Sequence, residues 1–199
     1  MLTIIDYGSG NLKSISNGFL KVGTKPIISN DIEKIANSDY LVLPGVGSFG
    51  SAMKHIEPFK DVILEHVNNG KPFLGICLGL QILFTKSEES PGVKGLDIFK
   101  GEVKKIPEGH KIPHIGWNNL KVIKKCPIFS DSKEDYLNQY FYFVHSYHCV
   151  PKEDIITGLV DYSGDLTASV SENNIFATQF HPEKSGIAGL KILKNFINL

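Results

Sequence analysis

Short apolar runs alternate with segments of helical periodicity through the first half of the chain. Leu12, Ile15 and Phe19 recur at near-helical spacing behind Asn11, a residue type that caps helix N-termini. Strands that alternate with helices form a parallel sheet covered on both faces, and such sheets bind ligands at the carboxyl ends of their strands. The pattern predicts helices at 11–22, after Asp31, at 58–69 and from Leu78 through Phe84, and strands at 2–6, 26–29, 40–43 and 72–76.

The second half, from about Gly95 to Gln179, is richer in β-branched and aromatic residues, which favours antiparallel or mixed strands. A final helix is expected over 186–197, with Leu190, Leu193 and Phe196 on one face. No linker is apparent, so we expect one domain over residues 1–199. Its fold class is three-layer α/β, with a mostly parallel central sheet and an additional antiparallel or mixed β portion. The strands expected in this half are 98–103, 120–123, 140–145, 155–160, 168–171 and 176–180.

The 199 residues include 21 basic and 21 acidic side chains, so the formal net charge is zero. Neutrality argues against binding to nucleic acid or to an anionic membrane surface. Every basic residue is lysine, a bias that an AT-rich genome explains. The longest apolar run, 72–84, is too short to span a bilayer, and the N-terminus lacks a secretory pattern. Three cysteines without a CxxC pair suit a reducing compartment, so we expect a cytoplasmic protein.

The strongest chemical signal is Gly75-Ile76-Cys77-Leu78-Gly79, which follows an apolar strand and opens a helix. This is the cysteine form of the nucleophile elbow, a sharp strand-to-helix turn that exposes a reactive side chain. Glycines two residues before and two after the nucleophile are needed because a side chain there would clash. A helix N-terminus also stabilises a thiolate, so we expect Cys77 to be a nucleophile and not merely a buried hydrophobe.

The second signal is Gln179-Phe180-His181-Pro182-Glu183, where a strand ends at a histidine. A cysteine nucleophile needs a base that takes its proton and returns it to the leaving group. A third group must hold the tautomer of that base, and Glu183 is close enough in sequence to do so. Cys77, His181 and Glu183 are therefore predicted to form a catalytic triad.

The segment 44–50 contains the spacing G-x-G-x-x-G, which also occurs in dinucleotide-binding turns. That fingerprint belongs on the first strand–helix turn, whereas this segment follows the third strand. We favour a flexible backbone that brings N–H donors near Cys77 to stabilise an oxyanion. His110 with His114, and His145 with His148 and Cys149, are expected to be ordinary packing or surface residues, so no metal is predicted.

Six segments spread from residue 6 to residue 185 carry a family resemblance: Asp6–Asn11, Leu43–Gly47, Gly75–Gly79, Pro113–Asn118, Tyr142–Tyr147 and His181–Ser185. Together they resemble the class I glutamine amidotransferases, and among these the glutaminase subunits of imidazole glycerol phosphate synthase. The resemblance implies that Cys77 attacks the side-chain amide of glutamine and that no cofactor is required. The oxyanion would meet the N–H of Leu78 and an N–H of the Val46–Gly47 segment.

The resemblance also assigns substrate and partner contacts. Ammonia would pass to a (βα)8-barrel synthase subunit in a heterodimer, which makes imidazole glycerol phosphate and an aminoimidazole ribotide in histidine biosynthesis. In this family a peptide of the segment 44–47 is thought to rotate when the synthase holds its ligand, and glycines make that rotation sterically cheap. Glutamine would be bound by Gly45, Gln81 and the backbone near His145, Ser146 and Tyr147, and the partner by Asn11, Trp117 and Lys184.

Three alternatives stay open at this stage. A paralogue could feed ammonia to a different synthase, for example in amino-sugar assembly for surface polysaccharide, with the same catalytic residues. A non-catalytic partner subunit could keep the fold and only regulate a synthase, although the intact Cys77, His181 and Glu183 argue against it. A free hydrolase or peptidase with the same elbow would be strongly active without a partner.

Overall fold

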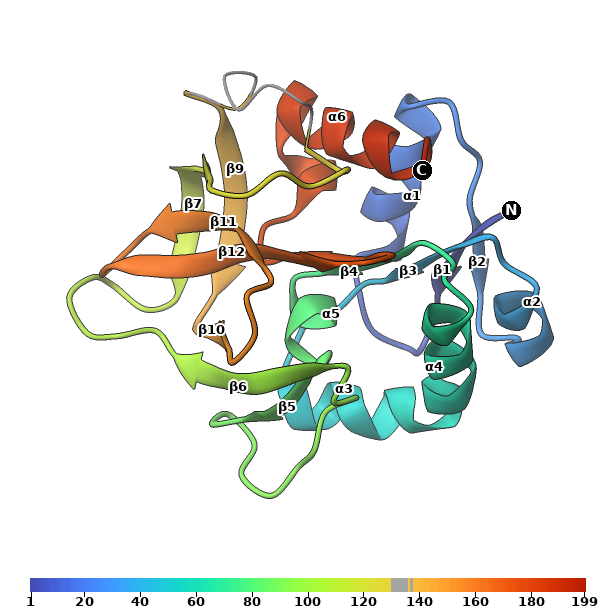
Figure 1. The fold of residues 1–199 in the computed structure, drawn as a ribbon, viewed down its shortest axis with the longest axis horizontal. Coiled ribbons are helices and arrows are strands. Elements are labelled where there is room, and N and C mark those ends of the chain that lie inside the picture. The colour runs from blue at the N-terminus through green and yellow to red at the C-terminus, as the bar shows by residue number, and fades with distance from the viewer. Residues whose placement is uncertain (130–135, 137) are drawn as a thin grey trace.

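An eight-stranded sheet runs through the centre of the computed structural model, which describes residues 1–129, 136 and 138–199 (Figure 1). The five strands at one side run parallel, and the three at the other side continue the sheet in antiparallel fashion. This arrangement confirms the fold class expected from the sequence. In spatial order the strands are β2 (Ile27–Ser29), β1 (Leu2–Ile5), β3 (Tyr40–Leu43), β4 (Phe73–Ile76), β13 (Ile175–Thr178), β12 (Asp165–Glu172), β11 (Ile156–Asp161) and β8 (Lys121–Val122).

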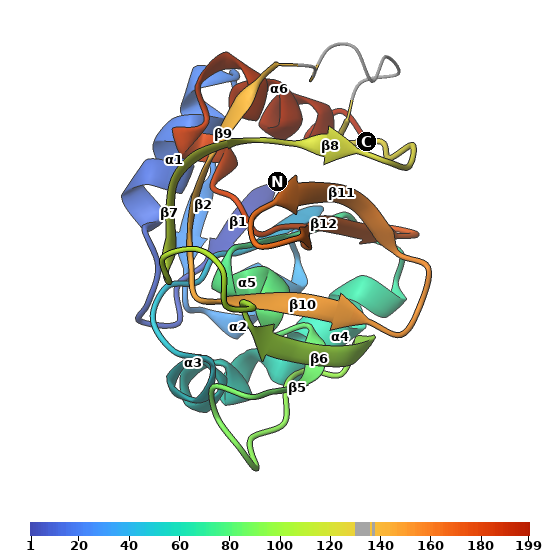
Figure 2. The same cartoon turned by 90° about the vertical axis from the view of Figure 1, so that its left-hand side faces the viewer.

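Two smaller sheets complete the β structure. One is three-stranded and lies on the same side of the central sheet as α3 and α4, as Figures 1 and 2 show from two directions. The other is an antiparallel pair whose register places His114 opposite His145 and Trp117 opposite Tyr142. The first comprises β10 (Tyr147–Pro151), β6 (Phe99–Lys105) and β5 (Phe84–Ser87), and the second β7 (His114–Asn119) and β9 (Tyr140–His145).

Helices cover both faces of the central sheet, α1 and α6 on one and α3 to α5 on the other (Figure 1). Successive side chains of a strand point to opposite faces of the sheet, so the sheet separates two apolar clusters. In β3, Leu41 and Leu43 pack in one cluster and Val42 packs in the other. No helix in the described part of the chain is long and apolar enough to cross a membrane. The helices are α1 (Leu12–Lys21), α2 (Ile32–Ala36), α3 (Phe49–Ile56), η1 (Glu57–Phe59), α4 (Lys60–Asn68), α5 (Leu78–Gln81), η3 (Pro182–Lys184) and α6 (Gly186–Phe196).

Most sequence predictions are confirmed to within a few residues, including Asn11 and Asp31 as helix caps. The helix expected through Phe84 is wrong in extent, because α5 ends at Gln81 and Phe84 already pairs with Phe99 in β5. Helix α3 was not predicted, since Ser48 makes no side-chain cap and the preceding glycines resemble a loop. Strands β5, β7 and β10 were also missed.

Candidate active site

Cys77 stands at the turn between β4 and α5, with a backbone φ of 58° that is strained for any residue but glycine. The flanking glycines are required, as the sequence predicts. A Cβ on Gly79 would lie 2.0 Å from the carbonyl oxygen of Leu43, and one on Gly75 would lie 2.8 Å from the carbonyl oxygen of Gly79. Leu78 is the first residue of α5, so its N–H has no acceptor within the helix.

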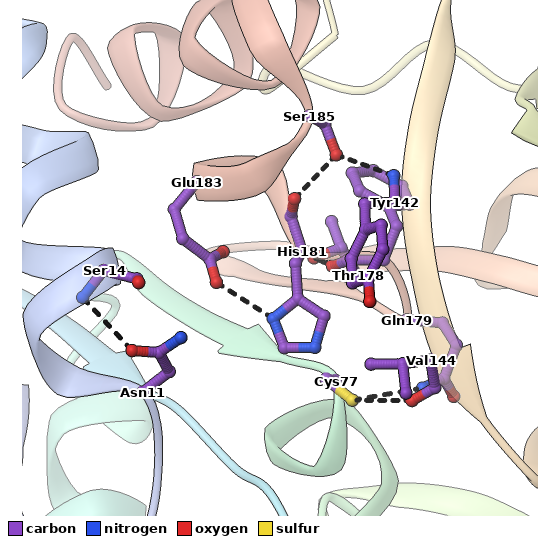
Figure 3. Close-up of polar contacts among 11 residues, drawn as sticks. Asn11, Ser14, Cys77, Tyr142, Val144, Thr178, Gln179, His181, Glu183 and Ser185 are labelled. Atoms are coloured by element: carbon purple, nitrogen blue, oxygen red, sulfur yellow. Dashed lines mark hydrogen bonds and ion pairs between the residues drawn. The ribbon is translucent and has the colours of Figure 1, made fainter. Parts of the chain in front are cut away.

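His181 follows β13 and is fixed from several sides (Figure 3). Its Nδ1 lies 2.9 Å from Oε1 of Glu183, and both side chains are buried. Its backbone N–H donates to the carbonyl of Tyr142, and its carbonyl accepts from the hydroxyl of Ser185 at 2.6 Å. The imidazole thus lies between Glu183 and the sulfur of Cys77, as a base for this thiol requires (Figure 3).

The electrostatics favour a proton on His181. Burial lowers the pKa of this imidazole, but the Cys77 sulfur and the Glu183 carboxylate outweigh burial and raise the pKa to about 9. Among the described residues, Nε2 of His181 has no hydrogen-bond partner. His181 therefore combines a nitrogen that is free for chemistry with a strong preference for the charged form.

A cavity of about 350 Å³ opens in front of Cys77 and His181. Gly45 does not line this cavity, because its Cα packs against the start of α5. A Cβ added to Gly45 would lie 2.6 Å from the Cβ of Leu78. The cavity lies at the carboxyl ends of three strands of the parallel sheet, β3, β4 and β13, where such sheets bind ligands. Its lining comprises Val46, Gly47, Cys77, Leu78, Gln81, Glu89, Pro113, Val144, His145, Ser146, Tyr147 and His181.

His145 also lines the cavity, but its ring nitrogens are both engaged. Nδ1 lies 2.8 Å from the carbonyl oxygen of Tyr147, which can only accept, so Nδ1 carries the proton. Nε2 then accepts from Nδ1 of His114 at 3.1 Å. Burial lowers the pKa of His145 to about 3 and that of His114 to about 4, so both rings are neutral. His145 is therefore a structural neighbour of the cavity and not a second base.

The segment between β3 and α3 forms another wall of the cavity. Gly47 has φ of 96°, and a Cβ there would meet no atom within 4 Å. The carbonyl of Val46 accepts from the hydroxyl of Ser9 at 2.9 Å, which sets the orientation of the Val46–Gly47 peptide. Both residues face the cavity together with Leu78.

The three residues predicted at a partner interface lie outside the cavity. Trp117 is 56 % exposed on β7 and contacts the Tyr142 ring edge-on, with centroids 5.9 Å apart. The ammonium of Lys184 lies 5.4 Å from the centroid of the same ring. Asn11 caps α1, which packs against η3. Trp117, Tyr142 and Lys184 thus form one continuous surface.

Two polar residues of the site were missed by sequence reasoning: Glu89, which lines the cavity, and Gln179, which is fully buried beside Cys77. Glu89 accepts from the backbone N–H of Phe49 at 2.6 Å and so caps α3 from a distant loop. Nothing local marks it, because its partner is 40 residues away. Gln179 lies 3.7 Å from the Cys77 sulfur through Nε2. Strand alternation could have found it, since positions 179 and 181 share one face.

The described residues contain no cluster of three or more His, Cys, Asp or Glu side chains that could hold a metal ion. The three cysteines Cys77, Cys126 and Cys149 are free thiols. The groups at the cavity include a thiol, an imidazole with its carboxylate, and backbone N–H donors. Such a set suits acyl transfer through a covalent thioester.

The family model of class-I glutamine amidotransferases matches residues 3–199. The chain belongs to this family. It is 51% identical to the imidazole glycerol phosphate synthase subunit HisH of Methanocaldococcus jannaschii over the whole of both chains. It is 49% identical to the subunit of the same name from Methanothermobacter thermautotrophicus, over 100% of this chain and 98% of the relative.

Solved structures share the fold at much lower identity. A structure of PurLQS from Thermotoga maritima matches with a TM-score of 0.75 and 20% identity, covering 99% of this chain and 97% of that one. The glutaminase domain of Trypanosoma brucei CTPS matches with a TM-score of 0.66 and 14% identity, covering 98% and 91%. These matches agree with the three-layer α/β architecture.

Proposed function

We propose that this protein is the glutaminase subunit of an imidazole glycerol phosphate synthase, a single-domain chain that acts in the cytoplasm. It hydrolyses glutamine to glutamate and ammonia and passes the ammonia to a synthase subunit. The observation that carries the proposal is that Cys77 and His181 line one cavity while the buried Glu183 holds Nδ1 of His181. Full-length relatives named as subunits of that synthase support the choice of pathway.

The reaction begins when the Cys77 thiolate attacks the side-chain carbonyl carbon of glutamine, with its proton held on His181. The tetrahedral intermediate collapses as His181 gives that proton to the leaving nitrogen, and ammonia departs. His181 then takes a proton from water, which attacks the γ-glutamyl thioester. Glutamate leaves and the thiol is restored, so each bond formed to sulfur is broken again without a cofactor.

The negative charge on the substrate oxygen needs N–H donors in place before it develops. Leu78 offers the free N–H at the start of α5, and the Val46–Gly47 segment offers a second donor. Among the described residues that line the cavity, Glu89 is the only one with a carboxylate side chain, which suits the α-ammonium group of an amino acid. Gln81 and the backbone near His145, Ser146 and Tyr147 would bind the remaining main-chain groups of glutamine, with Gly45 shaping the wall behind them.

The synthase partner would be a (βα)8 barrel in a heterodimer with this chain. Asn11, Trp117 and Lys184 are the residues that we assign to this contact. An exposed tryptophan in edge-on contact with a tyrosine is typical of interface anchors, which supports the assignment of Trp117. A Cβ added to Gly47 would meet no atom within 4 Å, and glycine adopts many backbone conformations. Both features suit a Val46–Gly47 peptide that rotates when the partner binds its own substrate.

The test is synthesis by the reconstituted pair with either glutamine or ammonium salt as nitrogen source. The Cys77→Ala variant should lose glutamine-dependent synthesis and keep ammonia-dependent synthesis. Glutamine use by this variant would refute the role of Cys77. Complementation of a histidine auxotroph that lacks its own glutaminase subunit separates this pathway from a paralogous one, because a paralogue would not restore growth.

A further inference from the structure

Gln179 is fully buried directly after β13 and contacts the sulfur of Cys77. We propose that Gln179 is the side-chain hydrogen-bond donor that stabilises the Cys77 thiolate, and that it also orients Gln81 toward the substrate. The proposal rests on the proposed function for the identity of the nucleophile. It adds a residue to the site whose only signal in the sequence is its position two residues before His181.

A backbone carbonyl fixes the direction of this hydrogen-bond relay. Nε2 of Gln81 lies 3.1 Å from the carbonyl oxygen of Tyr147, which can only accept. The same Nε2 donates to Oε1 of Gln179 at 3.0 Å. The Gln179 amide must therefore turn its Nε2 toward the Cys77 sulfur (Figure 3), because the flipped amide would set donor against donor.

Besides the His181 imidazole, the sulfur has two polar neighbours of opposite character. The carbonyl oxygen of Val144 lies 3.9 Å away and accepts the thiol proton, whereas Nε2 of Gln179 lies 3.7 Å away and donates (Figure 3). When the proton moves to His181, the Val144 carbonyl repels the new negative charge. Hydrogen bonds to an ionised acceptor are shorter and roughly twice as strong as neutral ones. The Gln179 bond therefore gains strength at the step where the nucleophile forms.

The relay also determines what Gln81 offers to the cavity. Both N–H groups of its amide are used, one by Tyr147 and one by Gln179. Its carbonyl oxygen is left as the available group, so it can accept from a substrate N–H. Loss of the Gln179 acceptor would free this amide to rotate, and glutamine binding would weaken.

Alkylation of Cys77 by iodoacetamide as a function of pH reads thiolate formation without any glutamine turnover. The full chain is used, with Cys77→Ala as the background for Cys126 and Cys149. In Gln179→Met the midpoint of the alkylation curve should move up by about one pH unit, because a donor to the anion is lost. In Gln179→Glu, which is close to Gln179 in shape, it should move further because a like charge faces the sulfur.

Gln139→Met is the matched control, since Gln139 is exposed and does not line the cavity. Its alkylation curve should coincide with that of the unmodified chain. An unchanged curve in either Gln179 variant, with an unchanged melting temperature, would overturn the proposal and reduce Gln179 to packing. This outcome is independent of the proposed function, whose failure would appear as absence of glutamine hydrolysis by the complex of the unmodified chain with its synthase subunit.

Steady-state kinetics with the reconstituted synthase separate the two halves of the relay. Gln179→Met should lower kcat about tenfold and raise KM for glutamine. Gln179→Glu should lower kcat at least as much but raise KM less, because a carboxylate still accepts from Gln81. Equal KM increases in both variants would contradict the role assigned to the Gln81 contact.

Discussion

Two buried histidines line the same cavity with opposite charge preferences. His181 faces a carboxylate, and its pKa is raised to about 9. His145 faces a carbonyl and a second imidazole, and its pKa is lowered to about 3, mainly by burial. The difference shows that burial alone does not determine the charge of a histidine. The Cys77 sulfur and the Glu183 carboxylate make one ring a proton carrier, and the absence of such neighbours leaves the other a neutral hydrogen-bonding group.

The two histidines also differ in whether a ring nitrogen is free of hydrogen bonds. Nε2 of His181 has no partner among the described residues, whereas both nitrogens of His145 are engaged. Only His181 can therefore exchange a proton with Cys77 or with a leaving group.

The largest effect is expected for His181→Asn. Glutamine hydrolysis by the reconstituted complex should fall by about 10³-fold, since general acid–base catalysis contributes roughly 10²–10⁴-fold. His55→Asn is the control, because His55 is exposed on α3 and should leave the rate unchanged. A His181→Asn enzyme within tenfold of the unmodified rate would assign the base elsewhere.

The next effect is expected for Glu183→Gln, which keeps the size of the side chain but removes its charge. The pKa of His181, followed by NMR titration of the ring, should fall clearly below 9 because a carboxylate no longer favours the imidazolium. Glutamine hydrolysis should fall on the order of 10²-fold as the ring loses its preferred tautomer. An unchanged titration would show that Cys77 alone raises this pKa.

The contrast also predicts how stability changes with pH. The pKa of a histidine in the unfolded chain is about 6.5. Because the pKa of His145 in the folded chain is about 3, the unfolded chain binds a proton at this residue between pH 6.5 and 3 and the folded chain does not. Its contribution to stability is complete above pH 6.5 and is lost on acidification, by about 2 kcal/mol between pH 6.5 and 5. His181 acts in the opposite sense, because its contribution is complete below pH 6.5 and is lost as pH rises through 9.

The loss of stability on acidification is measured as the difference between the free energies of unfolding obtained by urea denaturation at pH 6.5 and at pH 5. His145→Asn should lose this part of the pH dependence, and His55→Asn should retain it. If the free energy of unfolding changed equally with pH in His145→Asn and in the unmodified chain, the neutral state assigned to His145 would be contradicted.

The smallest effect is expected for His114→Phe. The ring of His114 stacks on Tyr162 with centroids 3.9 Å apart, and phenylalanine can keep this contact. The donor to Nε2 of His145 is lost, which should reduce the free energy of unfolding by about 1 kcal/mol. Glutamine hydrolysis should stay within threefold, because the bond lies behind the cavity wall. A large loss of activity with unchanged stability would point to a direct role for His114.

Local sequence patterns predicted the parts of the site that are built locally. The elbow around Cys77 is one strand–turn–helix unit. Glycine is needed at positions 75 and 79 because a side chain there would clash with the neighbouring backbone. His181 and Glu183 are two residues apart, so their pairing needs only one turn of η3. The alternation of strands and helices likewise predicted the parallel half of the sheet.

Features that depend on distant partners could not be predicted in this way. Helix α3 begins without a side-chain cap of its own and is capped by Glu89 and Ser90 from a loop 40 residues away. Gln179 meets Gln81 across 98 residues. Strand β5 starts directly after α5 because β6 pairs with it, and no periodicity in 84–87 indicates that pairing.

The central claim is that Cys77 forms a covalent intermediate with glutamine in this cavity. It is tested most directly by mass spectrometry of the chain after reaction with a glutamine analogue that carries a chloromethyl ketone in place of the side-chain amide. The account predicts one equivalent of label on the peptide that contains Cys77, no label in Cys77→Ala, and protection by excess glutamine. Label on Cys126 or Cys149, or labelling that glutamine does not slow, would contradict it.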